Sequence, residues 1–588
     1  MNYLNPIYTE KRECQDCYKC VRNCPVKAIK VEGGYASVIP ELCIICGHCV
    51  EVCPNGAKRV RDDLPLARQL LGAKERVYVS LAPSYVSEFP GVRPGQMVHA
   101  LKRLGFAGVS ETALGAQEVS AQAAALLEAA GKSADRSAVF YSSACPTVVS
   151  YLQKHRPEDS AFITSLLSPL LTHCTMLRRH FGQDIGIVFI GPCIAKKVEA
   201  ATHPELLETV LTFEDLARWF ASEKIDPTLI EPDFEEGFVS DRADEGAWYP
   251  VDGGMIAGMK SICAVNDCSF MSFSGISAIE KAISGLSGSR LESPLFLELL
   301  ACEGVCVNGP KASRRDGTAS KRCRVLRQGK NDGVRLPRKA SLSTSSDFAV
   351  PPAVAPKPVE AQIREALKTV GKFSHEDELN CGGCGYDSCR EFARALIGQK
   401  AERSMCVTYM RKLALKKANA LIQKMPSAVV IVNDAMRIIE YNGAFAKMFG
   451  MKAEGPDAPP LEGVMLREVM PFANLFHSVL KTGDEIMDRD LRYQNTILHT
   501  SIFTIEKHCV VGAILQDITE PAVRKQQVIR KAQEVIQRSL TTTQEIARLL
   551  GESAAESEIT LNSIIDSFSP VKPEEPKADN DWRKLYRR

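Results

Sequence analysis

The sequence has no excess of charge of either sign. Its 588 residues include 73 Lys and Arg against 71 Asp and Glu, which gives a formal net charge of +2 at pH 7. A protein that binds nucleic acid or an anionic membrane through its bulk charge is usually strongly basic. The overall electrostatics therefore favour neither partner, and the function must be sought in local motifs.

Long apolar segments are also missing. No run approaches the ~18 to 20 apolar residues of a membrane-spanning helix, and no apolar segment of signal-peptide form follows Met1. We therefore expect a cytoplasmic protein. At the usual ~100 to 200 residues per domain, we expect several domains.

Cysteine, in contrast, is abundant. The chain has 21 cysteines, most of them in clusters with short spacings. In a small secreted domain such cysteines would form disulfides, but in a long chain without a secretion signal they indicate metal sites. This composition favours a reducing, anaerobic cytoplasm.

Two cysteine runs near the N-terminus share one spacing. Residues 14–25 read CQDCYKCVRNCP and residues 43–54 read CIICGHCVEVCP, and both are C-x2-C-x2-C-x3-C-P. This is the bacterial two-cluster ferredoxin pattern, in which three thiolates of each run hold one 4Fe-4S cluster and the fourth crosses to the other cluster. The alternative is zinc, but a tetrahedral zinc site leaves half of each run without a role. Within a predicted ferredoxin domain at 1–70, the expected ligands are Cys14, Cys17, Cys20 and Cys53 for one cluster, and Cys43, Cys46, Cys49 and Cys24 for the other.

The central region, residues 76–326, has an α/β pattern. Strand-like runs (VYVSLAP, SAVFYSS, IGIVFIG) alternate with helical patterns (GQMVHALKRLGF, LTFEDLARWFAS), which predicts parallel sheets. Three cysteine segments lie at or just after such runs: SSACP, GPCIAKKVE and LELLACEGVCVNG. A single cysteine at a strand end is more often a small buried residue than a ligand. The shared position of all three segments is what indicates a site.

Together the three segments resemble the catalytic domain of the iron-only, di-iron hydrogenases, where they occur in this order around the H-cluster. The second signature of that family, P-C-x-x-K-x-x-E, is matched in full by Pro192, Cys193, Lys196 and Glu199. The resemblance implies that Cys306 also bridges to a di-iron unit with CO and CN ligands, and that Lys196 donates a hydrogen bond to a cyanide. These two residues are the catalytic candidates. The implied ligands of the 4Fe-4S part are Cys145, Cys193, Cys302 and Cys306.

Departures from the family pattern affect proton transfer. Ala144 stands where active hydrogenases have a second cysteine, and Gln122 stands about where they have a glutamate. Neither side chain passes a proton near neutral pH, and general-acid transfer is worth ~100- to 10,000-fold in rate. We expect slow turnover, with a domain that lacks the di-iron unit as the alternative. Further departures are Gly191 in place of methionine, and Val305, Pro310 and Lys311 in place of glycines.

Other residues of this region have no partner pattern. We expect His173 to be structural rather than a ligand. The same expectation holds for Cys174, Cys263, Cys268 and Cys323.

A linker and a third cysteine group follow. Residues 327–359 are rich in Ser, Pro and basic residues without periodicity, which predicts a linker that is flexible at first and stiffer in its proline part. The next domain, 360–411, contains C-x2-C-x4-C-x16-C and resembles small 4Fe-4S domains of electron-transfer and corrinoid proteins. Zinc is again the alternative. The expected ligands are Cys381, Cys384, Cys389 and Cys406.

The order of elements in 412–520 resembles a PAS domain, a sensor with a five-stranded antiparallel sheet. Strand patterns include AVVIVN, RIIEYN, DRDLRYQ, LHTSIFTIE and CVVGAILQDIT. His508 and Cys509 lie in the last of these regions, and we expect them to be sheet residues rather than cofactor ligands. We assign no cofactor to this domain.

A predicted coiled coil at 521–567 and a disordered tail at 568–588 complete the chain. A single amphipathic helix is the alternative to the coiled coil, because three heptads are a marginal length. The heptad positions are Val528, Ala532, Val535, Ser539, Thr542, Ile546 and Leu549.

This domain order is similar to that of the sensory iron-only hydrogenases. The resemblance implies a homodimeric protein that binds and slowly cleaves H2 (H2 = 2 H+ + 2 e−) and signals through its clusters and PAS domain. No kinase or phosphatase signature is present, so the output protein would be a separate kinase or phosphatase. The alternatives are an enzyme that exchanges electrons with a ferredoxin, and an electron-transfer or redox-sensing scaffold without the di-iron unit.

Overall fold

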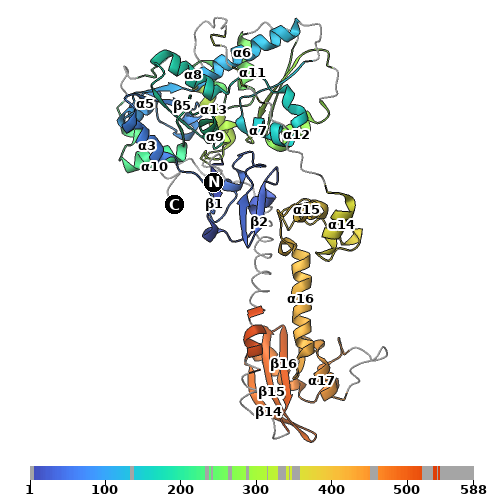
Figure 1. Ribbon diagram of the computed structural model, residues 1–588. Helices are drawn as coiled ribbons and strands as arrows, with labels where there is room; N and C mark the ends of the chain where they lie inside the picture. Colours follow the sequence, from blue (N-terminus) through green and yellow to red (C-terminus); the bar gives the residue numbers. More distant parts are fainter. Residues whose placement is uncertain are drawn as a thin grey trace. The chain divides into compact units, whose positions relative to one another are not determined.

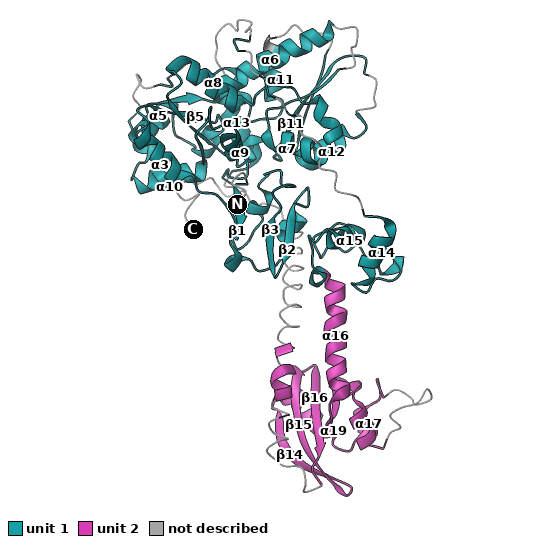
Figure 2. Ribbon diagram, in the orientation of Figure 1, with its two compact units in different colours: residues 1–405, 576–588 teal, residues 406–575 magenta. Residues whose placement is uncertain are grey.

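The chain divides into two compact units, Met1–Met405 with Pro576–Arg588, and Cys406–Glu575 (Figure 2). Cys263 and the predicted tail lie outside the described residues, as does the predicted coiled coil except for 531, 534–539 and 541–542. No helix in the described part of the chain has the length and apolar character needed to cross a membrane. The computed structural model describes residues 5–132, 138–231, 237–239, 243–262, 268–286, 291–313, 316–328, 340–342, 345–346, 348, 358–450, 461–519, 531, 534–539 and 541–542.

The N-terminal segment consists of two small hairpin-like sheets and two single-turn helices. Strand β1 (Ile7–Thr9) pairs antiparallel with β4 (Lys58–Val60), and β2 (Ile29–Glu32) pairs antiparallel with β3 (Tyr35–Val38). Helix α1 (Lys19–Arg22) lies within the first cysteine run and α2 (His48–Glu51) within the second. Each helix is preceded by a residue with positive φ, Tyr18 at 57° and Gly47 at 82°. The chain therefore turns sharply at the equivalent point of both runs.

Two parallel sheets form the hydrogenase-like region (Figure 1), as the sequence predicts. The first has the order β6 (Gly108–Glu111), β5 (Val77–Leu81), β8 (Gly186–Gly191), β9 (Thr209–Thr212). The second has the order β10 (Ser269–Ser274), β11 (Leu295–Leu300), β7 (Val139–Tyr141). The helices are α3 (Leu64–Ala73), α4 (Tyr85–Glu88), α5 (Pro94–Arg103), α6 (Ala113–Gly131), α7 (Pro146–His155), α8 (Pro169–Phe181), α9 (Lys196–Thr202), α10 (Phe213–Ser222), α11 (Gly254–Ile262), α12 (Ile276–Ile283) and α13 (Thr318–Gln328).

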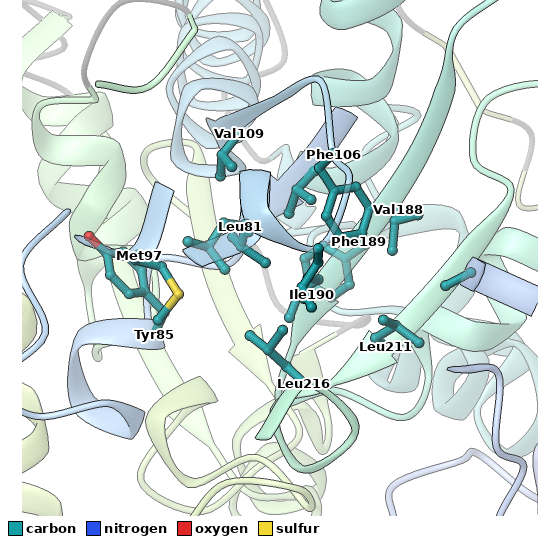
Figure 3. Close-up of a cluster of buried hydrophobic side chains, with 14 of the residues drawn as sticks. Leu81, Tyr85, Met97, Phe106, Val109, Val188, Phe189, Ile190, Leu211 and Leu216 are labelled. Atoms are coloured by element: carbon teal, nitrogen blue, oxygen red, sulfur yellow. The ribbon is translucent and has the colours of Figure 1, made fainter. Parts of the chain in front are cut away.

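The first sheet is buried on both faces, which is why its strands read as continuous apolar runs rather than alternating ones. Every residue of β5, β8 and β9 is buried. Figure 3 shows Leu81, Ile190 and Leu211 of these strands packed with side chains of the flanking helices, such as Leu216 of α10. Each such side chain contributes about 1.5–3 kcal/mol by burial. This core fixes the strand ends from which the cysteine segments leave.

A small helical domain closes the first unit. Helices α14 (Glu360–Lys368) and α15 (Cys389–Ile397) pack on each other through Ile363, Leu367 and Ala393. Ser388 caps α15 by accepting a hydrogen bond from the backbone N–H of Glu391.

The second unit contains the five-stranded antiparallel sheet expected of a PAS domain, in the order β13-β12-β16-β15-β14. Its elements are α16 (Val407–Lys424), β12 (Ala428–Asn433), β13 (Ile438–Tyr441), α17 (Gly443–Met448), α18 (Leu466–Val469), α19 (Ala473–Thr482), β14 (Ile486–Tyr493), β15 (Thr496–Glu506) and β16 (Val510–Asp517). The expectation that His508 and Cys509 are strand residues is wrong. Both lie in the turn between β15 and β16, where His508 takes the positive φ of 62° that reverses the chain.

Part of the predicted linker is held against the hydrogenase-like region. The backbone N–H groups of Ser341 and Leu342 both donate to Glu118 Oε1 at 2.8 Å. The carbonyl oxygen of Phe348 accepts from Gln153 Nε2 at 2.7 Å. A Ser-rich composition without periodicity gave no sign of these contacts, because distant residues supply them, Glu118 on α6 and Gln153 on α7. We call Ser341, Leu342, Ser346 and Phe348 the docked linker residues.

Candidate metal centres

The strand ends place the four cysteines of the hydrogenase-like region. Cys193 follows β8 by two residues and Cys302 follows β11 by two residues, while Cys145 follows β7 and caps helix α7. Cys306 begins a short 3-10 helix, Cys306–Asn308. The positions after parallel strands are where α/β folds usually build their sites.

These four thiols are neighbours. The pKa of Cys302 is raised well above its usual range, first by burial and then by the charges of Cys306, Cys193 and Cys145. The same causes raise the pKa of Cys306, and burial with the charge of Cys145 raises the pKa of Cys193 to about 11. These four thiols are partly buried. Because the pKa values of Cys193, Cys302 and Cys306 are raised, these three require a cationic group to become thiolates together.

That donor set fits an iron-sulfur cluster. No group of three or more His, Cys, Asp or Glu side chains in the described ranges converges tightly enough to hold a single metal ion. A 4Fe-4S cluster does not need such convergence, because each of its four irons takes one thiolate.

Lys196 lies beside this group. Its Nζ donates to Ser168 Oγ at 3.1 Å and forms an ion pair with Glu199 Oε2 at 2.8 Å. Its positive charge lowers the pKa of Cys193 and Cys306, partly opposing the effect of burial. An ammonium group has three donors, so one remains to meet a ligand.

The two positions at which proton transfer was expected hold no acid. Ala144 is buried and packs with Phe296 and Met255, in the same apolar cluster as residues of α6. On α6, Gln122 Nε2 donates to Glu118 Oε1 at 3.1 Å. Because Glu118 also accepts from Ser341 and Leu342, this carboxylate beside Gln122 is engaged in holding the linker.

Sequence reasoning missed Glu298 and Tyr249. Glu298 lies within β11, and burial raises its pKa to about 7 although the N–H of Met255 donates to its Oε1 at 3.2 Å. The pKa of Tyr249 is raised by burial, then by the charges of Glu298 and Cys306. Glu298 Oε2 and the Tyr249 hydroxyl are buried, and no hydrogen-bond partner for either atom is found among the described residues, whereas most buried polar atoms have one. The acidic residue in the otherwise apolar strand LFLELL was the available signal.

The remaining departures from the family pattern have structural explanations. A side chain at Gly191 would meet the ring of Phe189 at 2.5 Å, so the place of the expected methionine is filled. Pro310 packs closely against Gly47 of the second cysteine run. A Cβ on Gly47 would lie 2.3 Å from the Cβ of Pro310. Lys311 pairs with Glu214 at 2.5 Å. Val305 is buried at φ 65° and ψ −162°, a region almost exclusive to glycine.

Both predicted ligand sets of the N-terminal segment are gathered in space. Cys14, Cys17, Cys20 and Cys53 line one cavity. Burial and the charges of the other three thiols raise the pKa of Cys20 to about 11, with Lys58 opposing the shift. The pKa of Cys49 is likewise raised by burial and by Cys46, Cys43 and Cys24. In each set the cysteine from the other run lies with the three from its own, so the donors fit two clusters.

Residues of the second of these sets and of the hydrogenase-like site line one cavity of about 380 Å³, Cys46 and His48 from the former region and Cys302 and Glu303 from the latter. Helix α7 joins the same two regions, because Lys154 Nζ donates to the carbonyl oxygen of Cys43 at 2.7 Å. The two sites are therefore adjacent.

The third cysteine group opens helix α15. Cys381 is exposed, Cys384 is half-buried and Cys389 is the buried first residue of α15. Asn380 Oδ1 accepts from the N–H of Cys389 at 2.8 Å. A helix N-terminus favours negative charge, which suits thiolate ligands. Cys406 is buried and is the first residue of the second unit.

Four family models match the chain. They are the C-terminal domain of the iron only hydrogenase large subunit (75–310), the 4Fe-4S dicluster domain (6–54), an Fe-S cluster family (377–408) and the PAS domain (417–485).

Similar proteins include two hydrogenase subunits. An NADP-reducing hydrogenase subunit of Solidesulfovibrio fructosivorans is 26% identical over 51% of this chain and 62% of its own length. The periplasmic iron hydrogenase large subunit of Nitratidesulfovibrio vulgaris is 24% identical over 52% of this chain and 86% of its own. This chain thus spans less than two thirds of the first relative.

Among solved structures, a hydrogenase of Chlamydomonas reinhardtii aligns with 18% identity and a TM-score of 0.36, covering 48% of this chain and 91% of its own. The family models match along the chain in the same order as the domains predicted from the sequence. The chain is an iron-only-hydrogenase-like protein that carries iron-sulfur domains and a PAS domain.

Proposed function

We propose that this protein is a sensor of hydrogen or of redox state. It binds H2 at an H-cluster, cleaves it slowly, and passes the electrons to its iron-sulfur clusters. The altered charge of those clusters changes the PAS domain, which signals to a separate kinase or phosphatase. A homodimer formed through the PAS domain and the C-terminal helix would carry this change, and a ferredoxin would exchange electrons with the N-terminal clusters.

The observation that carries the proposal is a site that keeps its anchoring groups and lacks its proton carriers. Lys196 remains buried between Ser168 and Glu199, beside Cys193 and Cys306. Ala144, by contrast, offers only a methyl group. Binding without rapid proton removal is useful to a sensor, since it limits the consumption of the signal.

In this proposal Cys145, Cys193, Cys302 and Cys306 hold the 4Fe-4S part of the H-cluster. When bound, the H-cluster supplies the site of heterolytic H2 cleavage and accepts two electrons while two protons leave. Lys196 orients the anionic ligands by a charge-assisted hydrogen bond, and Glu199 holds Lys196 in place. Ala144 provides a methyl group and no acid at the expected proton path, so the proton step is slow.

The further clusters are assigned to the ligand sets predicted from the sequence. The first set is Cys14, Cys17, Cys20 and Cys53, the second is Cys43, Cys46, Cys49 and Cys24, and the third is Cys381, Cys384, Cys389 and Cys406.

Infrared spectroscopy of the protein matured with the di-iron unit tests the proposal first. We expect bands of CO and CN ligands, and the Cys306→Ala variant is the control that should lack them. If the wild-type protein shows no such bands, H2 binding is excluded and a scaffold with clusters only remains. If the bands appear and turnover is as fast as in active hydrogenases, the enzyme function replaces the sensor.

The sensory step has its own test. The matured protein is mixed with a candidate output kinase, and autophosphorylation is followed under H2 and under N2. We expect the rate to depend on H2 with the wild-type protein and not with Cys306→Ala. Equal rates under both gases for every candidate partner would count against a signalling role.

A further inference from the structure

The small domain with the third cysteine group is docked on the ferredoxin-like segment. The backbone N–H of Val31 in β2 donates to the carbonyl oxygen of Lys400 at 2.9 Å. The N–H of Gly33 donates to Glu402 Oε1 at 2.6 Å. These contacts join residues more than 360 apart in sequence, and all lie within the first compact unit.

Two cations, one within the first cysteine run and one just after it, hold the loop that carries Cys381 and Cys384. Arg22 donates through Nη2 to the carbonyl oxygen of Cys17 at 3.0 Å and through Nη1 to that of Gly383 at 3.3 Å. Lys27 Nζ donates to the carbonyl oxygen of Gly385 at 3.1 Å, and also to those of Val21 and Arg22. Each cation therefore bridges the backbones of two cluster loops.

The approach is close enough to require glycine. Gly385 has φ +90°, and a Cβ there would lie 2.9 Å from Val21 Cγ1 and 3.3 Å from the backbone N of Arg22. Gly382, in the same loop, also has positive φ (+70°), but a Cβ there would meet nothing within 4 Å. The contact with the ferredoxin-like segment thus leaves no room for a side chain at position 385, whereas position 382 has room for one.

Lys27 connects the third cysteine group to Cys24. Its Nζ lies 6.0 Å from the centroid of the Tyr386 ring, and its backbone N–H donates to the carbonyl oxygen of Cys24 at 3.2 Å. Cys24 belongs to the second ligand set, the one that contains Cys46, and Cys46 and Cys302 line the same cavity. A continuous series of neighbouring sites therefore runs from the hydrogenase-like centre to the third cysteine group.

We propose that this docking makes the third cluster a direct one-electron partner of the cluster held by Cys43, Cys46, Cys49 and Cys24. In the transfer, the latter cluster is oxidised by one electron and the third is reduced by one, with no proton moved. Arg22 and Lys27 are positioning residues that hold the two loops together and favour the extra negative charge. The inference rests on the cluster assignments of the proposed function, but it does not need the di-iron unit.

Electron paramagnetic resonance of the full-length protein, loaded with iron-sulfur clusters and reduced with dithionite, tests this contact. Two unpaired spins in neighbouring clusters broaden and split each other's spectra. The reference is the sum of two spectra, that of the Cys384→Ala variant, which lacks the third cluster, and that of an isolated 4Fe-4S cluster. We expect the wild-type spectrum to differ from this sum. A wild-type spectrum equal to that sum would overturn the proposal.

Gly385→Ala is the decisive variant, and Gly382→Ala is its matched control. Both replace a glycine of positive φ in one loop, but only position 385 meets Val21 and Arg22. We expect Gly385→Ala to lose the spin coupling at unchanged iron content and Gly382→Ala to retain it. If both variants retain the coupling, or both lose it with full iron content, the docking contact is not what couples the clusters.

A side-chain pair serves as a second test if Gly385→Ala loses iron. Lys27→Met should weaken the coupling, whereas Lys30→Met should not, because Lys30 pairs only with Glu32 on its own hairpin. Equal coupling in the two variants would contradict the positioning role. Two measurements separate the possible failures. A wild-type protein without iron at Cys381 refutes the assignment of the third cluster. Missing infrared bands of CO and CN refute only H2 binding.

Discussion

Restoring a thiol at position 144 should accelerate hydrogen turnover. In Ala144→Cys a group with an ordinary pKa near ~8.5 replaces a methyl group that carries no proton. A well-placed general acid is worth ~100- to 10,000-fold. We expect the lower end of this range for the single variant, because Gln122, the next position of the relay, still cannot ionise.

The protein should tolerate this change. Ala144 is 8% exposed and packs against Phe296 and Met255, so one added sulfur atom costs about 1–3 kcal/mol by overpacking. Domains of this size are usually stable by ~5–15 kcal/mol. The variant should therefore fold and take up the same cofactors as the wild-type protein.

The double variant Ala144→Cys, Gln122→Glu should turn over hydrogen faster than the single variant. The Gln122 side-chain amide lies 3.1 Å from Glu118 Oε1, so a carboxylate there faces a second carboxylate. Two like charges at this distance raise the pKa of one member, which brings it toward neutral pH and suits it to proton transfer.

Hydrogen evolution with reduced methyl viologen is the assay, normalised to the infrared bands of the bound H-cluster. Ala144→Ser is the matched control, because its hydroxyl has nearly the size of the thiol but is not acidic near neutral pH. Equal rates for the Cys and Ser variants at full occupancy would refute the reasoning and place the slow step elsewhere.

Three further predictions concern stability and the linker. Burial lowers the pKa of His173 to about 3, below its ordinary ~6.5. Below pH 6.5 the unfolded chain therefore binds a proton that the folded chain does not, and stability falls by up to ~1.4 kcal/mol per pH unit. Urea unfolding at pH 7 and pH 5 should show this loss in the wild-type protein and a smaller one in His173→Gln. Lys197→Met leaves Asp63 buried with Arg61 as its remaining partner, and should lower the free energy of unfolding by about 3 kcal/mol; an unchanged urea midpoint would contradict this. Glu118→Ala should speed hydrogen exchange at the N–H groups of Ser341 and Leu342, and unchanged exchange there would show that this carboxylate does not hold them.

Cysteine spacing allowed specific ligand sets to be predicted because a ligand run is a local feature. The residues between Cys14 and Cys24 fold back on themselves, so their spacing already defines which sulfurs converge, and only the crossing cysteine comes from elsewhere. The apolar runs before Cys193 and Cys302 predicted parallel strands for a related reason. Strands buried on both faces have a distinctive composition, and the cysteines follow them by two residues.

Contacts between distant segments were not predictable in this way. The requirement for glycine at 385 comes from Val21, and the docking of the predicted linker comes from Glu118 on α6. Neither partner stands out in the sequence, because each is an ordinary residue until the fold brings the other close. The placement of His508 in a turn has a similar cause, since the hairpin needs a positive φ that the apolar pattern around it conceals.

The substitutions at the hydrogenase-like site fall into two groups with different physical effects. Val305 occupies a glycine-type backbone conformation, which costs about 1–3 kcal/mol. Its buried side chain packs with Val251 and Leu300, and burial of a valine returns about 1.5–3 kcal/mol. The backbone cost and the burial gain of Val305 nearly cancel in free energy. The loop between Cys302 and Cys306 therefore keeps its path without the family's glycine. Ala144 has no such compensation, because no packing gain replaces a lost acid.

A chain under selection only to fold would have no reason to keep Lys196 and Glu199 buried beside the thiols, since a buried ion pair is seldom a net source of stability. Loss of proton carriers together with retention of this pair is therefore the combination expected if binding is needed and rapid turnover is not.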